Sequence, residues 1–154
     1  MEVFNFKKRL FFVFFDISLL LITFLSVYFG VNRLITYLLY PDVIVFSFFT
    51  VFSILFFLLT MPIIALSVNP IGKGRQANIV FQKNMGKAII LGLLFIIIST
   101  ILFNVIFTND LNKEGYIKCR GIPSGWMPGM AVKYALSEEL CMKKLSAESH
   151  LVGR

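Results

Sequence analysis

Long apolar runs separated by short polar segments dominate the first two thirds of the chain. Three of these runs lack Lys and Arg, and they cover residues 10–30, 43–67 and 88–108. Each is long enough for a membrane-spanning helix, which needs about 20 residues. None alternates between apolar and polar residues as the strands of a membrane β-barrel do. The pattern therefore predicts three transmembrane helices.

The composition strengthens this prediction. Hydrophobic residues make up 58% of the 154 residues and charged residues 15%, whereas a soluble globular domain has about 25% charged residues. A water-soluble chain of this length has too little interior to bury so much apolar surface. We therefore expect an all-α membrane protein, with a three-helix transmembrane domain over residues 1–108 and a small tail over residues 109–154.

Positive charges predict how the chain is oriented. Cytoplasmic loops collect Lys and Arg, and such residues stand at positions 7–9 before the first run and again between the second and third runs. The loop between the first two runs has Arg33 as its only basic residue. This predicts a multi-pass protein of a bacterial inner membrane with a cytoplasmic N-terminus and a periplasmic C-terminus. Basic residues early in the tail weaken the asymmetry.

Both cysteines of the chain, Cys119 and Cys141, lie in the tail. Disulfides persist in the periplasm and are rare in the cytosol, so a bridge is favoured over two unrelated thiols. The bridge would join a turn-rich segment to a helix that we expect over about residues 130–145. A metal site is not expected, because two cysteines and the distant His150 lack the spacing of a four-ligand zinc site.

Small and polar residues recur every seven positions inside the apolar runs, which places each set on one helix face. Such residues usually face protein rather than lipid, so we expect a compact bundle with these faces inward. The repeating positions are Asp16, Thr23 and Gly30 in the first run, Ser53, Thr60 and Ser67 in the second, and Gly92 and Ser99 in the third, with Asn104 nearby.

Asp16 is the only acidic residue in the three runs. A charged group at the centre of a bilayer costs about 2.5–3.5 kcal/mol on insertion scales and is a functional candidate. Because the second helix runs antiparallel to the first, we expect Asp16 to lie level with Thr60 and Pro62. Three roles remain open: pairing with a nearby lysine such as Lys7 or Lys8, packing within an oligomer, and handling of an ion or proton.

The tail also carries aromatic and basic residues that could meet a partner, namely Tyr116, Arg120 and Trp126. Tyr and Trp are favoured at the membrane interface, and Tyr, Trp and Arg are enriched at binding hot spots. Both interpretations stay open. The basic loop over residues 68–87 is expected to contact anionic lipid head groups. It lacks the pattern of a P-loop, and no nucleic-acid-binding motif is visible.

The tail resembles a small family of uncharacterised bacterial inner-membrane proteins known as domain of unknown function 1240. The resemblance lies in residues 115–121 (GYIKCRG), 123–125 (PSG) and 128–130 (PGM) and in Cys141. It would extend over nearly the whole chain and implies an inner-membrane location. The family brings no catalytic or binding residues that can be transferred.

Catalysis is not expected, because the single histidine stands near the C-terminus and the carboxylates of the tail are typical of solvated charges. No cofactor is expected either. The leading hypothesis is a non-catalytic binding protein of the immunity type, which protects its cell against a membrane-targeting toxin. The alternatives are an oligomeric transporter or channel subunit for ions or small solutes that uses Asp16, and an accessory subunit of a larger membrane complex. The expected partners are the lipid bilayer, a toxin or another membrane protein, and a second copy of the chain.

Overall fold

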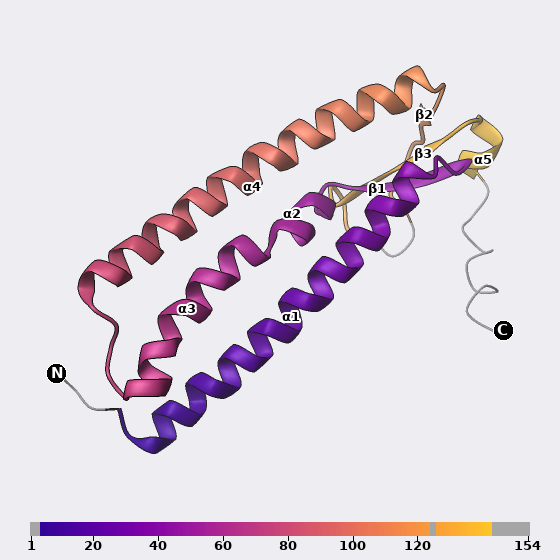
Figure 1. The fold of residues 1–154 in the computed structure, drawn as a ribbon. Coiled ribbons are helices and arrows are strands. Elements are labelled where there is room, and N and C mark those ends of the chain that lie inside the picture. Colours follow the sequence, from indigo (N-terminus) through magenta and orange to yellow (C-terminus); the bar gives the residue numbers. More distant parts are fainter. Residues whose placement is uncertain (1–3, 124–125, 143–154) are drawn as a thin grey trace. The chain divides into compact units, whose positions relative to one another are not determined.

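The computed structural model describes residues 4–123 and 126–142, and helices dominate these residues (Figure 1). Helix α1 covers Phe6–Leu38 and helix α4 covers Ile79–Lys113, while α2 (Thr50–Leu55) and α3 (Phe57–Lys73) follow each other between them. Among the described residues, three helical segments are long and apolar enough to cross a membrane: α1, α2 together with α3, and α4. The prediction of three spanning helices is confirmed, and they indicate a membrane protein.

The second spanning helix begins later than the sequence predicted. Residues Val43–Ser47 form strand β1, and the helix starts at Thr50. The sequence of this strand, VIVFS, is rich in β-branched and aromatic residues, which fit a pleated and half-buried surface. An apolar run alone does not distinguish such a strand from the first turns of a helix, and this is why the predicted start at residue 43 was wrong.

The structure divides into two compact units, and the first comprises residues 1–31 and 51–99. In this unit α1 approaches α2 very closely at Gly30. A Cβ atom at Gly30 would lie 2.8 Å from Cγ1 and 3.0 Å from the backbone nitrogen of Ile54. The hydroxyl of Ser26 donates a hydrogen bond of 3.1 Å to the carbonyl of Ser53 in the same region. Only a residue without a side chain leaves room for this approach.

A second close approach joins α3 to α4 in the same unit. A Cβ atom at Gly92 would lie 3.3 Å from the carbonyl oxygen of Leu58. Pro62 lies four residues after Leu58 inside α3 and has no N–H to offer this carbonyl. The buried positions of α1, α3 and α4 in this unit include Asp16, Thr23, Thr60, Ser67 and Ile96. The predicted inward faces of the first two spans are thus confirmed.

The N-terminal end of α1 is attached to the C-terminal end of α3. The Arg9 guanidinium donates hydrogen bonds of 2.9 and 2.5 Å to the carbonyl of Ile71 and one of 3.1 Å to that of Gly72. The backbone N–H of Phe4 bonds the carbonyl of Gly74 at 2.8 Å. A cation at a helix C-terminus satisfies carbonyls that have no partner within the helix and opposes the negative end of its dipole.

The second unit comprises residues 32–50 and 100–154, and its described part contains a sheet that the sequence analysis did not predict. The strands are β1, β2 (Ile117–Lys118) and β3 (Ala131–Ala135), in the antiparallel order β1-β3-β2. Val43 pairs with Ala135 and Ser47 with Ala131 across β1 and β3. The tail is therefore tied to a segment that precedes the second spanning helix.

The predicted C-terminal helix is present but begins later than expected, and the part of the prediction over residues 143–145 lies outside the described residues. Helix α5 covers Glu138–Met142, and Ala131–Ala135 is strand rather than helix. The reason is tertiary, since the backbone of β3 finds hydrogen-bonding partners in both β1 and β2.

The described part of the tail also contains the Cys119–Cys141 disulfide, with a Cα–Cα distance of 5.4 Å. The predicted bridge is confirmed.

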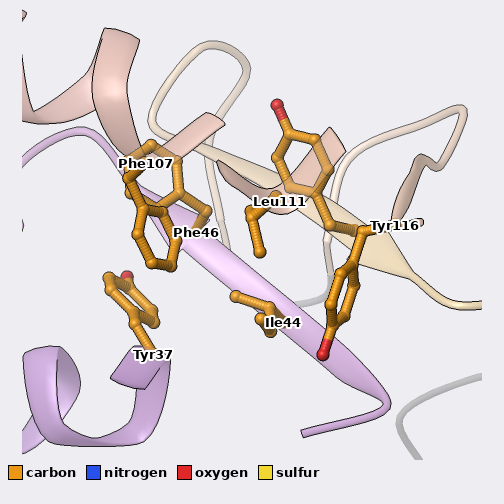
Figure 2. Close-up of a cluster of buried hydrophobic side chains, with 7 residues drawn as sticks. Tyr37, Ile44, Phe46, Phe107, Leu111 and Tyr116 are labelled. Carbon is orange, nitrogen blue, oxygen red and sulfur yellow. The ribbon is translucent and has the colours of Figure 1, made fainter. Parts of the chain in front are cut away.

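The second unit has a hydrophobic core built mainly from aromatic rings. Figure 2 shows the rings of Tyr37, Phe46 and Phe107 gathered beside Ile44 and Leu111. The ring centroids of Phe46 and Phe107 are 5.2 Å apart, and those of Tyr37 and Phe107 are 5.5 Å apart. This core joins the end of α1, strand β1 and the end of α4 within one unit.

We expect Gly30→Ala to destabilise the protein by about 1–3 kcal/mol, because the added methyl group overlaps the backbone of Ile54 and forces the helices apart. Gly86→Ala is the matched control. It lies in α4, and no atom lies within 4 Å of the place that the added methyl group would take, so the better helix propensity of Ala should leave stability unchanged or raise it by up to about 1 kcal/mol. Equilibrium unfolding in mixed micelles measures both, and a Gly30→Ala protein as stable as wild type would contradict the packing.

Candidate functional site

Asp16 forms the most unusual polar site among the spanning helices. Its side chain is 8% exposed, and its Oδ2 atom accepts a hydrogen bond from the hydroxyl of Ser67. The same hydroxyl lies 2.7 Å from the carbonyl of Ile64. The second carboxyl oxygen of Asp16, Oδ1, is buried and has no hydrogen-bond partner in the described part of the chain. A buried acceptor without a partner is costly, so this atom is a candidate for binding a proton or a cation.

Asp16 meets Ser67 rather than a residue at the predicted level of Thr60 and Pro62. Thr60 is buried, but its hydroxyl bonds the carbonyl of Phe57 at 3.3 Å in its own helix. Helix α3 continues to Lys73 rather than ending near Ser67, which moves the level facing Asp16 toward the C-terminal end of α3. Pairing of Asp16 with a lysine is also not observed, since the one ion pair in the described residues joins Lys113 and Asp110.

Asn104 is satisfied within α4. Its amide nitrogen donates to the carbonyl of Thr100 at 2.6 Å, and its backbone carbonyl accepts the hydroxyl of Thr108 at 2.7 Å. The side chain is half-buried. Such bonds to the preceding turn are common for polar residues in helices, and they give Asn104 a local role in α4 rather than a place in the Asp16 site.

The second unit contains a hydrogen-bond cluster around the hydroxyl of Tyr37, which contacts three polar groups of the chain. It accepts the backbone N–H of Ser47 at 2.8 Å and lies 3.1 Å from the hydroxyl of Thr50 and 3.2 Å from the carbonyl of Val45. The sequence analysis did not single out Tyr37. A signal was present, because Tyr37 follows Gly30 by seven residues and so continues the buried face of α1.

Tyr116 lies in the core of this unit, which corrects both alternatives left open for it, a place at the membrane interface and a place on a partner surface. Its side chain is 5% exposed, and its hydroxyl donates to the carbonyl of Pro41 at 2.9 Å. Burial raises the pKa of the Tyr116 phenol above its usual value, and the carboxylates of Asp42 and Glu114 and the nearby Tyr40 raise it further. Burial also raises the pKa of Tyr134 in β3.

Trp126 and Arg120 are the two predicted partner residues that remain accessible. The guanidinium of Arg33 lies 4.4 Å from the ring centroid of Trp126, at the distance of a cation–π contact. Trp126 is half-buried, and Arg120 is exposed directly after Cys119. Cys119, directly before Arg120, is fixed by the disulfide, and Arg33 contacts Trp126. We treat Arg33, Arg120 and Trp126 as the candidate binding residues of this unit and call them the Trp126 surface.

We expect the second unit to lose stability at high pH. A tyrosine whose pKa is raised by folding contributes stability below its unfolded pKa, near 10, and this contribution disappears as the pH rises through the folded value. Tyr116→Phe should lower stability by about 1 kcal/mol at neutral pH, because it removes the bond to Pro41, and should flatten the alkaline decline. Thermal unfolding from pH 7 to 11 measures both effects, and an equally steep decline in Tyr116→Phe would refute the assignment.

The comparisons with known proteins concern mainly the second and third spans and the tail. No curated protein and no solved structure matches the chain. A family model described as "Protein of unknown function (DUF1240)" matches residues 44–142. This region begins in β1, ends with α5 and includes both cysteines of the disulfide. Because the match extends over well more than half of its length, the chain belongs to the DUF1240 family.

Proposed function

We propose that this chain is a bacterial inner-membrane protein that acts by binding a protein partner, and that it protects its cell as an immunity protein against a membrane-targeting toxin. One observation carries the proposal: the second unit, called the module below, has a folded structure of its own. It has its own aromatic core, a three-stranded sheet and a disulfide. Anchoring in a membrane needs none of these, whereas each of them helps to hold a surface fixed for a partner.

The Trp126 surface is the part of the module that fits this role. Trp and Arg are among the residues most enriched at binding hot spots, and Arg33, Arg120 and Trp126 supply them here. A surface already held in place loses little entropy on binding. Cys119 precedes Arg120 directly, and its backbone N–H bonds the carbonyl of Lys133 at 2.9 Å, so the start of this segment is fixed on the sheet. The proposed mechanism is steric, with the module covering a surface of the toxin.

The proposed orientation places the N-terminus in the cytoplasm and the module in the periplasm. The bond from Phe4 to Gly74 brings the N-terminal residues to the turn between α3 and α4. Basic residues from both segments therefore gather at one end of the first unit, as cytoplasmic ends require. The disulfide in the second unit supports an oxidising compartment for the module.

Catalysis is not part of the proposal, since Cys119 and Cys141 are bonded to each other and neither is a free nucleophile.

Deleting the gene should make the cell sensitive to at least one toxin secreted by sibling strains, and the wild-type gene should restore survival. The double variant Arg120→Ala/Trp126→Ala should fail to restore it, because loss of one hot-spot side chain costs at least about 2 kcal/mol of binding. Lys113→Ala is the matched control, as an exposed cation paired with Asp110 outside the Trp126 surface. Survival counts with equal membrane levels of each variant are the measurement, and unchanged survival of the deletion strain against every sibling toxin would refute the proposal.

A second candidate function rests on Oδ1 of Asp16, a buried acceptor without a partner in the described residues. A carboxylate at such a position is typical of ion or proton pathways, and three helices would need further copies of the chain to enclose one. Under this alternative, liposomes containing the protein conduct protons or cations, and Asp16→Asn, which keeps the shape of the side chain, abolishes the flux. Ser18→Ala is the control, as an exposed position on the same helix. Equal flux in wild type and Asp16→Asn, or none in either, would exclude the alternative.

A further inference from the structure

A cavity of about 1000 Å³ lies at the turn between α3 and α4, within the first unit. Its wall is formed by the last turn of α3, the connecting residues and the first turn of α4. The polar part of the wall includes Asn69, Lys73, Arg75 and Asn78, and the apolar part includes Ile79 and Phe81. The cavity thus combines cationic and amide groups with an apolar side.

The charged residues among the described wall of this cavity are both positive. Lys73 and Arg75 are exposed, and no Asp or Glu occurs between residues 43 and 109 of the sequence. The single ion pair of the described chain, Lys113–Asp110, involves neither of them. A small anion entering the cavity would meet two cations and several amide groups, and none of the described wall residues is a carboxylate.

The helix ends at the cavity also favour an anion. The C-terminal carbonyls of α3 would repel one, but those of Ile71 and Gly72 already accept the guanidinium of Arg9. Helix α4 begins at Ile79, and Asn78 accepts the N–H of Val80 at 3.3 Å. The positive end of the α4 dipole therefore adds to the field of Lys73 and Arg75.

The cavity lies at one end of two of the apolar helical segments, and lipid head groups lie at the ends of membrane-spanning helices. It lies where α3 ends and α4 begins, and both helices belong to segments long and apolar enough to cross a membrane. Ile79 is 67% exposed beside the polar wall. A phospholipid likewise combines a polar part and an apolar part, because its anionic phosphate lies next to an apolar chain.

We propose that this cavity binds an anionic phosphate group, carried by a phospholipid head group or by a free phosphate compound. Lys73 and Arg75 bind the phosphate oxygens, the amides of Asn69 and Asn78 lie on the same wall, and Ile79 and Phe81 contact the first carbons of a lipid chain. The site is independent of the proposed function, since it uses no residue of the Trp126 surface. It also differs from general attraction of basic loops to a membrane, because it requires particular cations.

The test uses the purified full-length chain in micelles of an uncharged detergent, where membrane orientation plays no part. Short-chain phosphatidylglycerol, short-chain phosphatidylcholine and inorganic phosphate are titrated separately, and binding is followed by thermophoresis. We expect saturable binding of phosphatidylglycerol, weakened at least about tenfold in Lys73→Gln/Arg75→Gln, because charge-assisted bonds to two cations are lost. The matched control is Lys83→Gln/Lys87→Gln, which removes two exposed cations of α4 that are not part of the wall, and it should change affinity less than about twofold.

Each outcome decides the proposal. Binding of phosphatidylglycerol without binding of inorganic phosphate assigns the site to lipid, and equal binding of both assigns it to a free phosphate compound. An equal loss of affinity in the two double variants would show diffuse attraction and overturn the proposal, as would the absence of saturable binding to any probe. Circular dichroism melting curves that match the wild type show that a loss of affinity in Lys73→Gln/Arg75→Gln is not a loss of fold.

Discussion

Helices in lipid gain nothing from burying one apolar side chain against another, since the lipid tails are equally apolar, and this constraint shapes the first unit. Association depends instead on close backbone approach and on hydrogen bonds between helices. Gly30 and Gly92 allow the approach, and Ser26 and the Asp16–Ser67 pair supply the bonds. Large Phe, Leu and Ile side chains of α1 and α4 are left exposed, as a lipid-facing surface requires.

The second unit follows a different rule, although α1 contributes to both units. The buried face of α1 carries small and polar residues at Asp16, Thr23 and Gly30 and then an aromatic one at Tyr37. From Tyr37 onward, stability comes from stacked rings, strand pairing and a disulfide, as in a small water-soluble domain. The change from glycine to tyrosine on one helix face marks where the packing of the chain changes from close helix contact to an aromatic core.

Charge gives the two units different chemistry. In the first unit, Arg9 neutralises the C-terminal end of α3 and leaves Lys73 and Arg75 available at the cavity. In the second unit, Arg33 lies over Trp126, and Lys133 donates to the carbonyls of Leu140 and Cys141 at 2.8 and 3.0 Å. The excess of positive charge, +7 over the chain, therefore includes residues with separate tasks: helix capping, a candidate phosphate site and a candidate partner surface.

The amino-acid sequence alone determined the number of spanning segments, the inward faces of the first two, the disulfide and the family, because hydropathy, seven-residue spacing and cysteine placement are local or short-range signals. Tertiary structure decided the rest. Strands β1 and β3 pair segments from distant parts of the chain, and no local periodicity records such a pairing. The partner of Asp16 depends on where α3 ends, and the burial of Tyr116 depends on contact with Pro41. These features arise from the relative placement of elements, which a single sequence does not encode in any one segment.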